Sequence, residues 1–258
     1  MRNILAIGRR EVLSFFVSPV AYFVITGFLL LAGYFFFNYL LVFNVYMARF
    51  QGMPYPGAQP TPNLNQFVAE AFYQTLLIVL VFLIPLLTMR VIAEEKRRGT
   101  FELLVTSPIS VIEIVVGKFL GLAFVITTMM VLAGCFPLML CLYGNPEIMP
   151  LLSGLLGILL CALGFASIGM AVSAFTENQI VAGISSMVVL LLLYVIQSPA
   201  EAMGNTVGAA ILTYLSPIAQ VRDMVRGVIS ISSLVYFGSL IALGLFLSTR
   251  ALEAYRWR

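Results

Sequence analysis

Long runs without a charged side chain constrain this chain more than any other feature. Several runs of 17 or more residues, such as 20–43 and 180–196, contain no Asp, Glu, Lys or Arg. About 20 residues of helix cross the ~30 Å hydrocarbon core of a bilayer. Only 10% of the residues are charged, against about 25% in soluble domains. The sequence therefore predicts an all-α polytopic membrane protein, and it lacks the alternating ten-residue segments of a β-barrel.

The apolar runs predict six transmembrane helices, at about residues 20–43, 71–89, 111–142, 150–175, 180–196 and 231–248. We treat residues 20–258 as one transmembrane domain. Residues 44–70 contain four prolines and predict a polar, turn-rich loop. The broken stretch 200–215 predicts a dip or re-entrant element, because a further crossing would place the basic C-terminal tail outside.

The distribution of cations predicts the orientation of these helices. With both termini in the cytoplasm, eleven of the 14 Lys and Arg residues lie inside, and Arg49, Arg222 and Arg226 lie outside. Loops on the cytoplasmic side carry the excess of Lys and Arg. The N- and C-termini are therefore both predicted to be cytoplasmic.

Residues 1–19 predict an amphipathic helix suited to the membrane interface. Ile4, Leu5, Val12, Phe15 and Phe16 can share one broad face at helical spacing. The charged side chains Arg2, Arg9, Arg10 and Glu11 lie elsewhere on that helix. The alternative is a plain basic flank on the first span.

The densest charge cluster, Glu94–Arg98, lies between the second and third spans. Glu94 can meet Arg97 and Arg98 on a helix surface, and Gly99 can end that helix in a left-handed cap. Thr100 can then cap a short helix that has Glu102 in its first turn. Pro108 stops this helix, and Phe101, Leu104 and Val105 give it an apolar face.

A short helix of this kind has no core of its own, so it can lie on lipid or dock in a partner's groove. The alternative interpretation of the charge cluster is a stop-transfer signal, which explains the charges but not the capped helix that follows.

The third span has its own start signal. Ser110 and Glu113 form the S-x-x-E pattern of a capping box. Lys118 lies about two turns in, where it can snorkel to the headgroups. Pairs of small residues four apart, at Gly117/Gly121, Gly169/Ser173 and Gly204/Gly208, could allow close helix approach.

Several functions are disfavoured by what the sequence lacks. There is no histidine and no acid at mid-span, so an ion-coupled carrier is a weak interpretation. No phosphate-binding G-x-x-x-x-G-K-[ST] loop occurs, and no triad or set of metal ligands is available. We expect no catalytic residue, no metal and no cofactor in this chain.

The string "MRVIAEEKRRGTFELLVTSPIS", residues 89–110, resembles the signature of ABC-2 type transporter permeases. Residues 216–230 and the tail "ALEAYRWR" are most similar to the branch of gliding-motility-associated and nitrous-oxide-reductase-maturation permeases. The resemblance implies a permease subunit of an ATP-driven exporter in the bacterial cytoplasmic membrane. It implies pairing with a second permease subunit, as a homodimer or, as the alternative, a heterodimer, and with two cytoplasmic ATPase subunits that bind ATP and Mg. We expect membrane lipid as a further partner and no nucleic acid, and we leave open an accessory protein on the outer side.

The resemblance also implies residue roles. The ATPase-coupling element comprises Glu94, Glu95, Lys96, Arg97, Arg98, Gly99, Thr100, Phe101, Glu102, Leu103 and Leu104. The interface helix includes Arg9, Arg10 and Glu11. The outer re-entrant segment includes Arg222, Asp223, Arg226 and Gly227. The alternative function is a membrane anchor or scaffold that transmits conformational change without moving a substrate.

Overall fold

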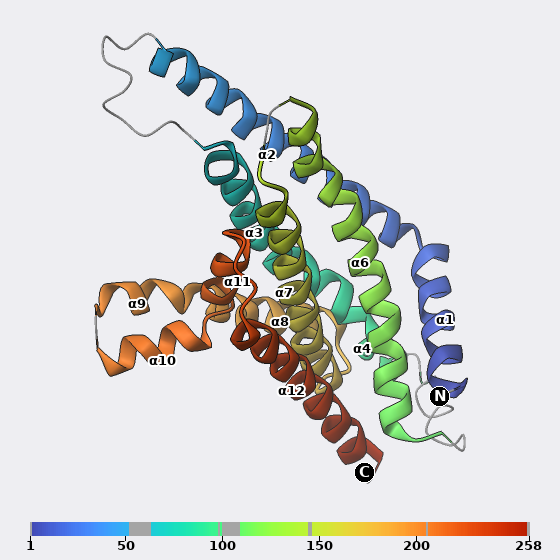
Figure 1. Cartoon of the computed structure of the whole chain (residues 1–258). Coiled ribbons are helices and arrows are strands. Elements are labelled where there is room, and N and C mark those ends of the chain that lie inside the picture. The colour runs from blue at the N-terminus through green and yellow to red at the C-terminus, as the bar shows by residue number, and fades with distance from the viewer. Residues whose placement is uncertain are drawn as a thin grey trace.

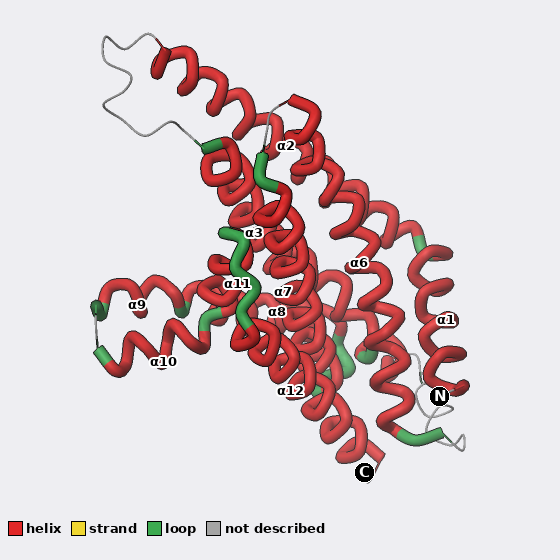
Figure 2. The backbone as a smooth tube through the Cα atoms, viewed as in Figure 1, coloured by secondary structure: helices red, strands yellow, loops and turns green. Residues whose placement is uncertain are grey.

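The computed structural model describes residues 2–51, 63–97, 99, 109–143, 146–204 and 206–256. Every regular element in these ranges is a helix (Figure 2). Within them, six helices are long and apolar enough to cross a membrane. The predicted class, an all-α polytopic membrane protein, is therefore confirmed.

Figure 1 shows the helices in their order along the chain. Their bounds are α1 Arg2–Val17, α2 Pro19–Gln51, the π-helical η2 Asn65–Glu70, α3 Ala71–Val91, α4 Ala93–Arg97, α6 Val111–Tyr143, α7 Ile148–Ala174, α8 Gln179–Val195, α9 Gln197–Ala202, α10 Val207–Leu215, α11 Pro217–Val225 and α12 Ile231–Arg256.

Helix α7 occupies the centre of the bundle and packs against α3, α6, α8, α11 and α12. Its most apolar stretch is 67% buried, against 17% for that of α8. Lipid is as apolar as a leucine side chain, so helix association in a membrane depends on close packing of small residues. The buried face of α7 is rich in Gly, Ala and Ser, which explains its central place.

Close packing is visible where α7 meets α3. Gly154 lies under the buried Tyr73 ring, where a Cβ would come within 2.4 Å of a ring carbon. The Tyr73 hydroxyl donates to the Leu151 carbonyl at 2.6 Å. Further along, a Cβ on Gly169 would come within 2.4 Å of Thr88 Oγ1. The predicted small pair Gly169/Ser173 therefore lies at a helix interface.

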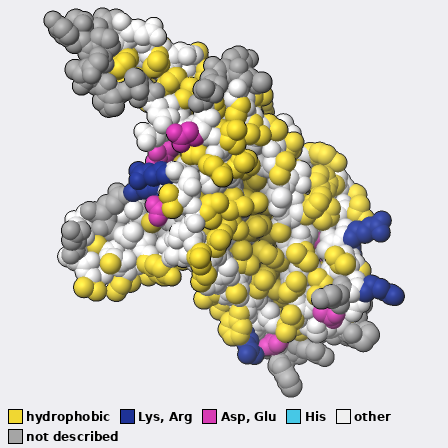
Figure 3. All heavy atoms as spheres, viewed as in Figure 1, with side chains coloured by type: hydrophobic (Ala, Val, Ile, Leu, Met, Phe, Trp, Pro, Cys, Tyr) yellow, Lys and Arg dark blue, Asp and Glu magenta, His cyan; other side chains and the backbone are white. Residues whose placement is uncertain are grey.

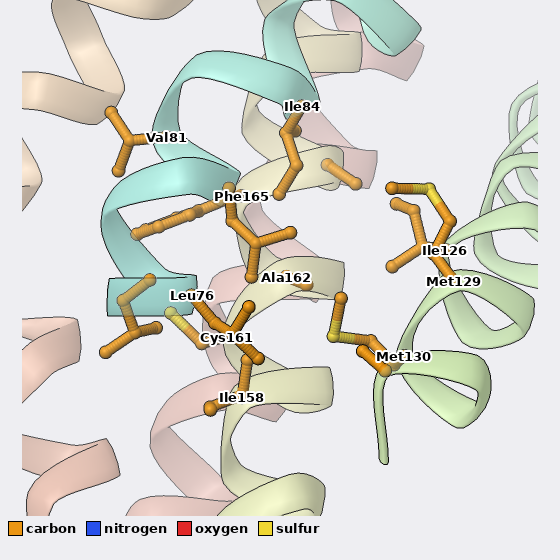
Figure 4. Close-up of a cluster of buried hydrophobic side chains, with 14 of the residues drawn as sticks. Leu76, Val81, Ile84, Ile126, Met129, Met130, Ile158, Cys161, Ala162 and Phe165 are labelled. Atoms are coloured by element: carbon orange, nitrogen blue, oxygen red, sulfur yellow. The ribbon is translucent and has the colours of Figure 1, made fainter. Parts of the chain in front are cut away.

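The buried side chains between α3, α6 and α7 form one apolar core (Figure 4). Phe165 and Cys161 of α7 face Leu76 and Ile84 of α3 on one side and the methionines of α6 on the other. Met129 and Met130 supply flexible side chains that fill irregular gaps. The core joins three of the candidate spans into one body.

The structure shortens the predicted loop 44–70 at both ends and carries the last helix beyond its predicted span. Residues 44–51 continue α2, because the chain has no glycine or proline there until Gly52. Residues 64–70 are helical as well and run into α3. The C-terminal tail also remains helical, to Arg256, because nothing after residue 248 breaks a helix. The predicted loop 44–70 is thus shorter than its polar composition suggested.

The broken stretch before the last span forms a hairpin of two short helices, α9 and α10, that projects from the bundle (Figure 1). Neither is long enough to cross a bilayer. Gly204 lies between them with a φ of +60°. The pair Gly204/Gly208 therefore belongs to a chain reversal and does not mark contact between long helices.

Both termini lie at the same end of the bundle, which we call the terminal end (Figure 1). The last turn of α6 and the first turn of α7 lie at the opposite end, which we call the far end. Between them the surface is broadly apolar, with charged side chains at its margins (Figure 3). Large exposed residues such as Phe23 and Leu192 contribute to this surface. Such a surface suits contact with lipid.

Candidate functional site

A buried lysine joins several helices at the terminal end. Lys118 of α6 has only 2% of its side chain exposed. Its ammonium lies 3.3 Å from Glu11 of α1 and 2.8 Å from Glu95 of α4. It also donates to the Val91 carbonyl at the end of α3, at 2.8 Å. We call Lys118, Glu11 and Glu95 the Lys118 cluster. The burial of the Lys118 side chain in this cluster corrects the expectation that Lys118 snorkels to the headgroups.

Small residues bring α1 close enough to make these bonds. The two helices run parallel, with Asn3 beside Glu113 and Glu11 beside Gly121. A Cβ on Gly121 would come within 2.6 Å of Glu11 Cβ, and one on Gly117 within 2.8 Å of Ile7 Cβ. The predicted small pair Gly117/Gly121 therefore seats α1. Glu11 points toward α6, rather than away from the apolar face as the sequence suggested.

The start of α6 is fixed by the predicted capping box. Glu113 accepts from the Ser110 amide at 3.1 Å, and the Glu113 amide donates to Ser110 Oγ at 3.3 Å. These bonds satisfy amide groups that have no partner within the helix. At 33 residues, α6 is about 50 Å long, which exceeds the ~30 Å hydrocarbon thickness. Its first turns can therefore extend beyond the hydrocarbon beside α1.

Two carboxylates share one ammonium in the Lys118 cluster. Burial raises the pKa of the Glu11 carboxyl above its ordinary value, while Lys118 acts in the opposite direction and Glu95 raises it further. A carboxylate withdrawn from water favours its neutral form unless a cation compensates. Lys118 is that cation, so the seating of α1 depends on it.

Helix α4 is attached to the rest of the bundle by a second set of contacts. Ser173, near the end of α7, accepts from the Ala93 amide at 3.1 Å and donates to the Met89 carbonyl at 3.3 Å. Lys96 donates to the Ala174 carbonyl and lies 4.4 Å from the centre of the Tyr255 ring. Such a cation–π contact adds attraction.

Glu94 completes these attachments by accepting from Gln179 Nε2 of α8 at 3.1 Å. The five-residue α4 thus contacts α6, α7, α8 and α12, besides following α3. A displacement of α4 would act on all of these helices at once, because a packed core transmits small movements as rigid-body shifts.

The structure describes part of the predicted coupling element. Glu94, Glu95, Lys96 and Arg97 lie in α4. Gly99 has the predicted left-handed conformation, with φ +70°, and its amide donates to the Lys96 carbonyl at 3.1 Å. Further predicted members lie outside the described residues, namely Arg98, Thr100, Phe101, Glu102, Leu103 and Leu104.

The predicted outer residues form a separate group, away from the Lys118 cluster. Arg222 and Asp223 lie in α11, which begins with a Ser216 N-cap followed by Pro217. Arg226 lies 3.8 Å from Glu70. Gly227 has a φ of +94° and lies against Pro150. Gly227 thus lies against the start of α7, and Arg226 pairs with the last residue of η2.

Sequence reasoning missed two connecting residues. Lys118 was treated as an isolated cation, although the glycines on either side of it, Gly117 and Gly121, were themselves identified as a contact face. That combination could have predicted a buried partner. Ser173 was recognised only for its small size, and its two hydrogen bonds had no signal in the sequence.

The bundle and its charged end define a class: a multi-pass helical membrane protein with a short polar element attached to several spans at one end. The family model of ABC-2 family transporter proteins matches residues 23–252. The chain therefore belongs to the ABC-2 transporter family. No protein of curated function matches it.

Membership identifies the chain as a membrane permease subunit of an ABC transporter. Such a subunit has no ATPase site of its own and associates with a cytoplasmic ABC ATPase.

Proposed function

We propose that this chain forms the transmembrane pathway of an ATP-driven exporter in the bacterial cytoplasmic membrane. Two copies would pair and would bind two cytoplasmic ATPase subunits, with both termini in the cytoplasm. The terminal end would then be the cytoplasmic end. ATP and Mg would be held by the ATPase and not by this chain. Within the family, we place it in the branch of gliding-motility-associated and nitrous-oxide-reductase-maturation permeases.

One observation supports this proposal above the others. Helix α4 contacts α6, α7, α8 and α12, and the chain that leaves it at Gly99 carries the apolar pattern Phe101, Leu104 and Val105. We assign residues 94–104 to the ATPase-coupling element, with the segment after Gly99 seated in a groove of the ATPase. Motion of the ATPase would reach the spans through α4.

The interface helix would take part in the same movement. Glu11 pairs with the lysine that holds Glu95, so α1 and α4 share one cation. Leu5 and Val17 of α1 are 69% and 83% exposed, which suits contact with the lipid boundary. We propose that α1 moves with α4 during each ATPase cycle.

The test is co-purification of the chain with its cognate ATPase, together with the ATPase activity of the complex. We expect Glu102→Ala and Leu104→Asp to reduce both, because they alter the docking segment. The matched controls are Glu147→Ala and Ile148→Asp, at the exposed far end, and they should reduce neither. Unchanged assembly and stimulation in the Glu102 and Leu104 variants would contradict the coupling role.

Transport and scaffolding are separated by a second measurement. Complexes reconstituted in vesicles would be supplied with candidate lipids or hydrophobic peptides. ATP-dependent movement of any of these across the bilayer supports the exporter. ATPase coupling with normal assembly of a larger complex, but without transport, would favour a scaffold that transmits conformational change.

A further inference from the structure

A cavity of about 420 Å³ lies at the terminal end, between the α1–α2 bend and the junction of α3 with α4. Arg10 lines it from α1, and Arg90 and Glu94 line it from the other wall. Val17 and Leu86 supply apolar lining. The cavity thus has both charged and apolar walls, and it lies at the end of the bundle that contains the Lys118 cluster.

Arg90 brings a guanidinium group to the cavity wall, and one of its donors is unsatisfied among the described residues. Its Nε–H is buried and has no hydrogen-bond partner in the part of the chain that the structure describes. A buried donor without an acceptor is costly, and more so when it is charged. Phosphate oxygens match the fork of a guanidinium group. Arg10, on the facing wall, places a second cation beside the same cavity.

Acidic side chains make the cavity wall mixed in charge. Glu11, Glu94 and Glu95 line the cavity with the two arginines. Lys118 lies behind Glu11 and Glu95. Together, the three glutamates, the two arginines and Lys118 carry three negative and three positive charges. A purely anionic ligand would satisfy Arg90 but would face the carboxylate of Glu94. A zwitterion that combines a phosphate with an ammonium matches both.

An apolar ridge leads from the cavity along α3. Ile78, Phe82 and Leu86 precede Arg90 at intervals of four residues, which places them on one ridge of the helix. They are 43%, 45% and 44% exposed. The ridge ends at the one arginine of α3. An amphiphile with a charged headgroup and an acyl chain has this distribution of polarity.

We propose that this cavity binds the headgroup of a phospholipid with a primary ammonium, such as phosphatidylethanolamine. The phosphate lies between Arg10 and Arg90, the ammonium faces Glu94, and an acyl chain follows the ridge from Leu86 to Ile78. Phosphatidylcholine has the same phosphate, but its quaternary ammonium has no N–H to donate. The site does not depend on the proposed transport function.

The site is tested by native mass spectrometry of the full chain in detergent, titrated separately with phosphatidylethanolamine, phosphatidylcholine, phosphatidylglycerol and inorganic phosphate. We expect saturable binding that is strongest for phosphatidylethanolamine. Arg10→Met should weaken it about tenfold, as expected for loss of one charge-assisted contact. The matched control is Arg9→Met, because Arg9 is its exposed neighbour and does not line the cavity.

Arg90→Met should weaken binding at least as much, and Arg90→Lys should restore part of it. Arg10 is exposed on α1, so its variant remains informative if Arg90→Met fails to fold. Stronger binding of phosphatidylglycerol would overturn the zwitterionic site, and equal binding of all three lipids would overturn headgroup recognition. Binding of inorganic phosphate alone would show an ion site. If Arg10→Met loses dimers of the chain but keeps its lipid binding, this surface binds a second copy of the chain and not a lipid.

Discussion

Replacing Lys118 with methionine is the sharpest test of the charge cluster. Methionine keeps an unbranched side chain but removes the ammonium that lies 3.3 Å from Glu11 and 2.8 Å from Glu95. Breaking a buried ion pair by removing one partner costs about 3–5 kcal/mol. The two carboxylates retain 15% and 19% exposure, so part of this cost is screened by solvent. We expect a loss of about 2–3 kcal/mol at neutral pH.

The loss should be smaller at low pH, because Glu11, whose pKa is raised by burial, can then become neutral by taking up a proton. It is measured by reversible unfolding of the purified chain in mixed micelles. The matched control is Arg250→Met, which removes a cation from the exposed 3.0 Å pair with Glu253 at the same end of the bundle. That surface pair should contribute no more than about 1 kcal/mol.

Removing the two acids as well should recover much of the stability. In the triple variant Lys118→Met with Glu11→Gln and Glu95→Gln, no buried charge is left without a partner. If Lys118→Met costs no more than Arg250→Met, or if the triple variant is no more stable than Lys118→Met, the reasoning is refuted.

Three further predictions concern pH, packing and a buried hydroxyl. The raised pKa of Glu11 means that the folded chain binds a proton on this carboxyl more tightly than the unfolded chain does. The stabilising contribution of protonated Glu11 is therefore greatest below the ordinary pKa of 4.5, and it is lost as pH rises through the raised pKa. From pH 4.5 upward, the melting temperature of the unaltered chain should fall relative to that of Glu11→Gln. Parallel plots of melting temperature against pH for the two proteins would contradict this. Gly121→Ala should destabilise by about 1–3 kcal/mol through steric overlap, whereas Gly27→Ala, with open space around it, should be neutral or slightly stabilising in the same unfolding assay. Ser173→Ala should cost about 1–3 kcal/mol by leaving the buried Ala93 amide without its acceptor, and faster hydrogen exchange at that amide is the check.

The membrane class and the helix starts could be predicted because they depend on local chemistry. Charge-free runs predicted the spans, Ser110 and Glu113 predicted the start of α6, and Gly99 predicted a left-handed turn. Each of these signals lies within a few residues of the feature that it specifies. The loop at 44–70 is shorter than its polar composition predicts, because neither of its two ends contains a helix breaker.

The pairing within the site could not be predicted in the same way. Lys118 and Glu11 are 107 residues apart, and neither position indicates which helix lies opposite. The packing of α1 along α6 brings them together, and that packing depends on the glycine face around Lys118. Ser173 likewise joins Met89 and Ala93 only because α7 lies against the end of α3. Local patterns identified the elements, whereas their contacts required the assembled structure.

The central claim is that the terminal end of the bundle receives an ATPase through the segment after Gly99. The most direct measurement is photo-crosslinking in cells, with a photoreactive amino acid placed at position 104 and, as the control, at position 147 of the far end. We predict a covalent adduct with an ABC ATPase from position 104 and none from position 147. An ATPase adduct from position 147 alone would contradict the proposed docking end. The absence of an adduct from both positions, in a complex that retains ATPase activity, would contradict it as well.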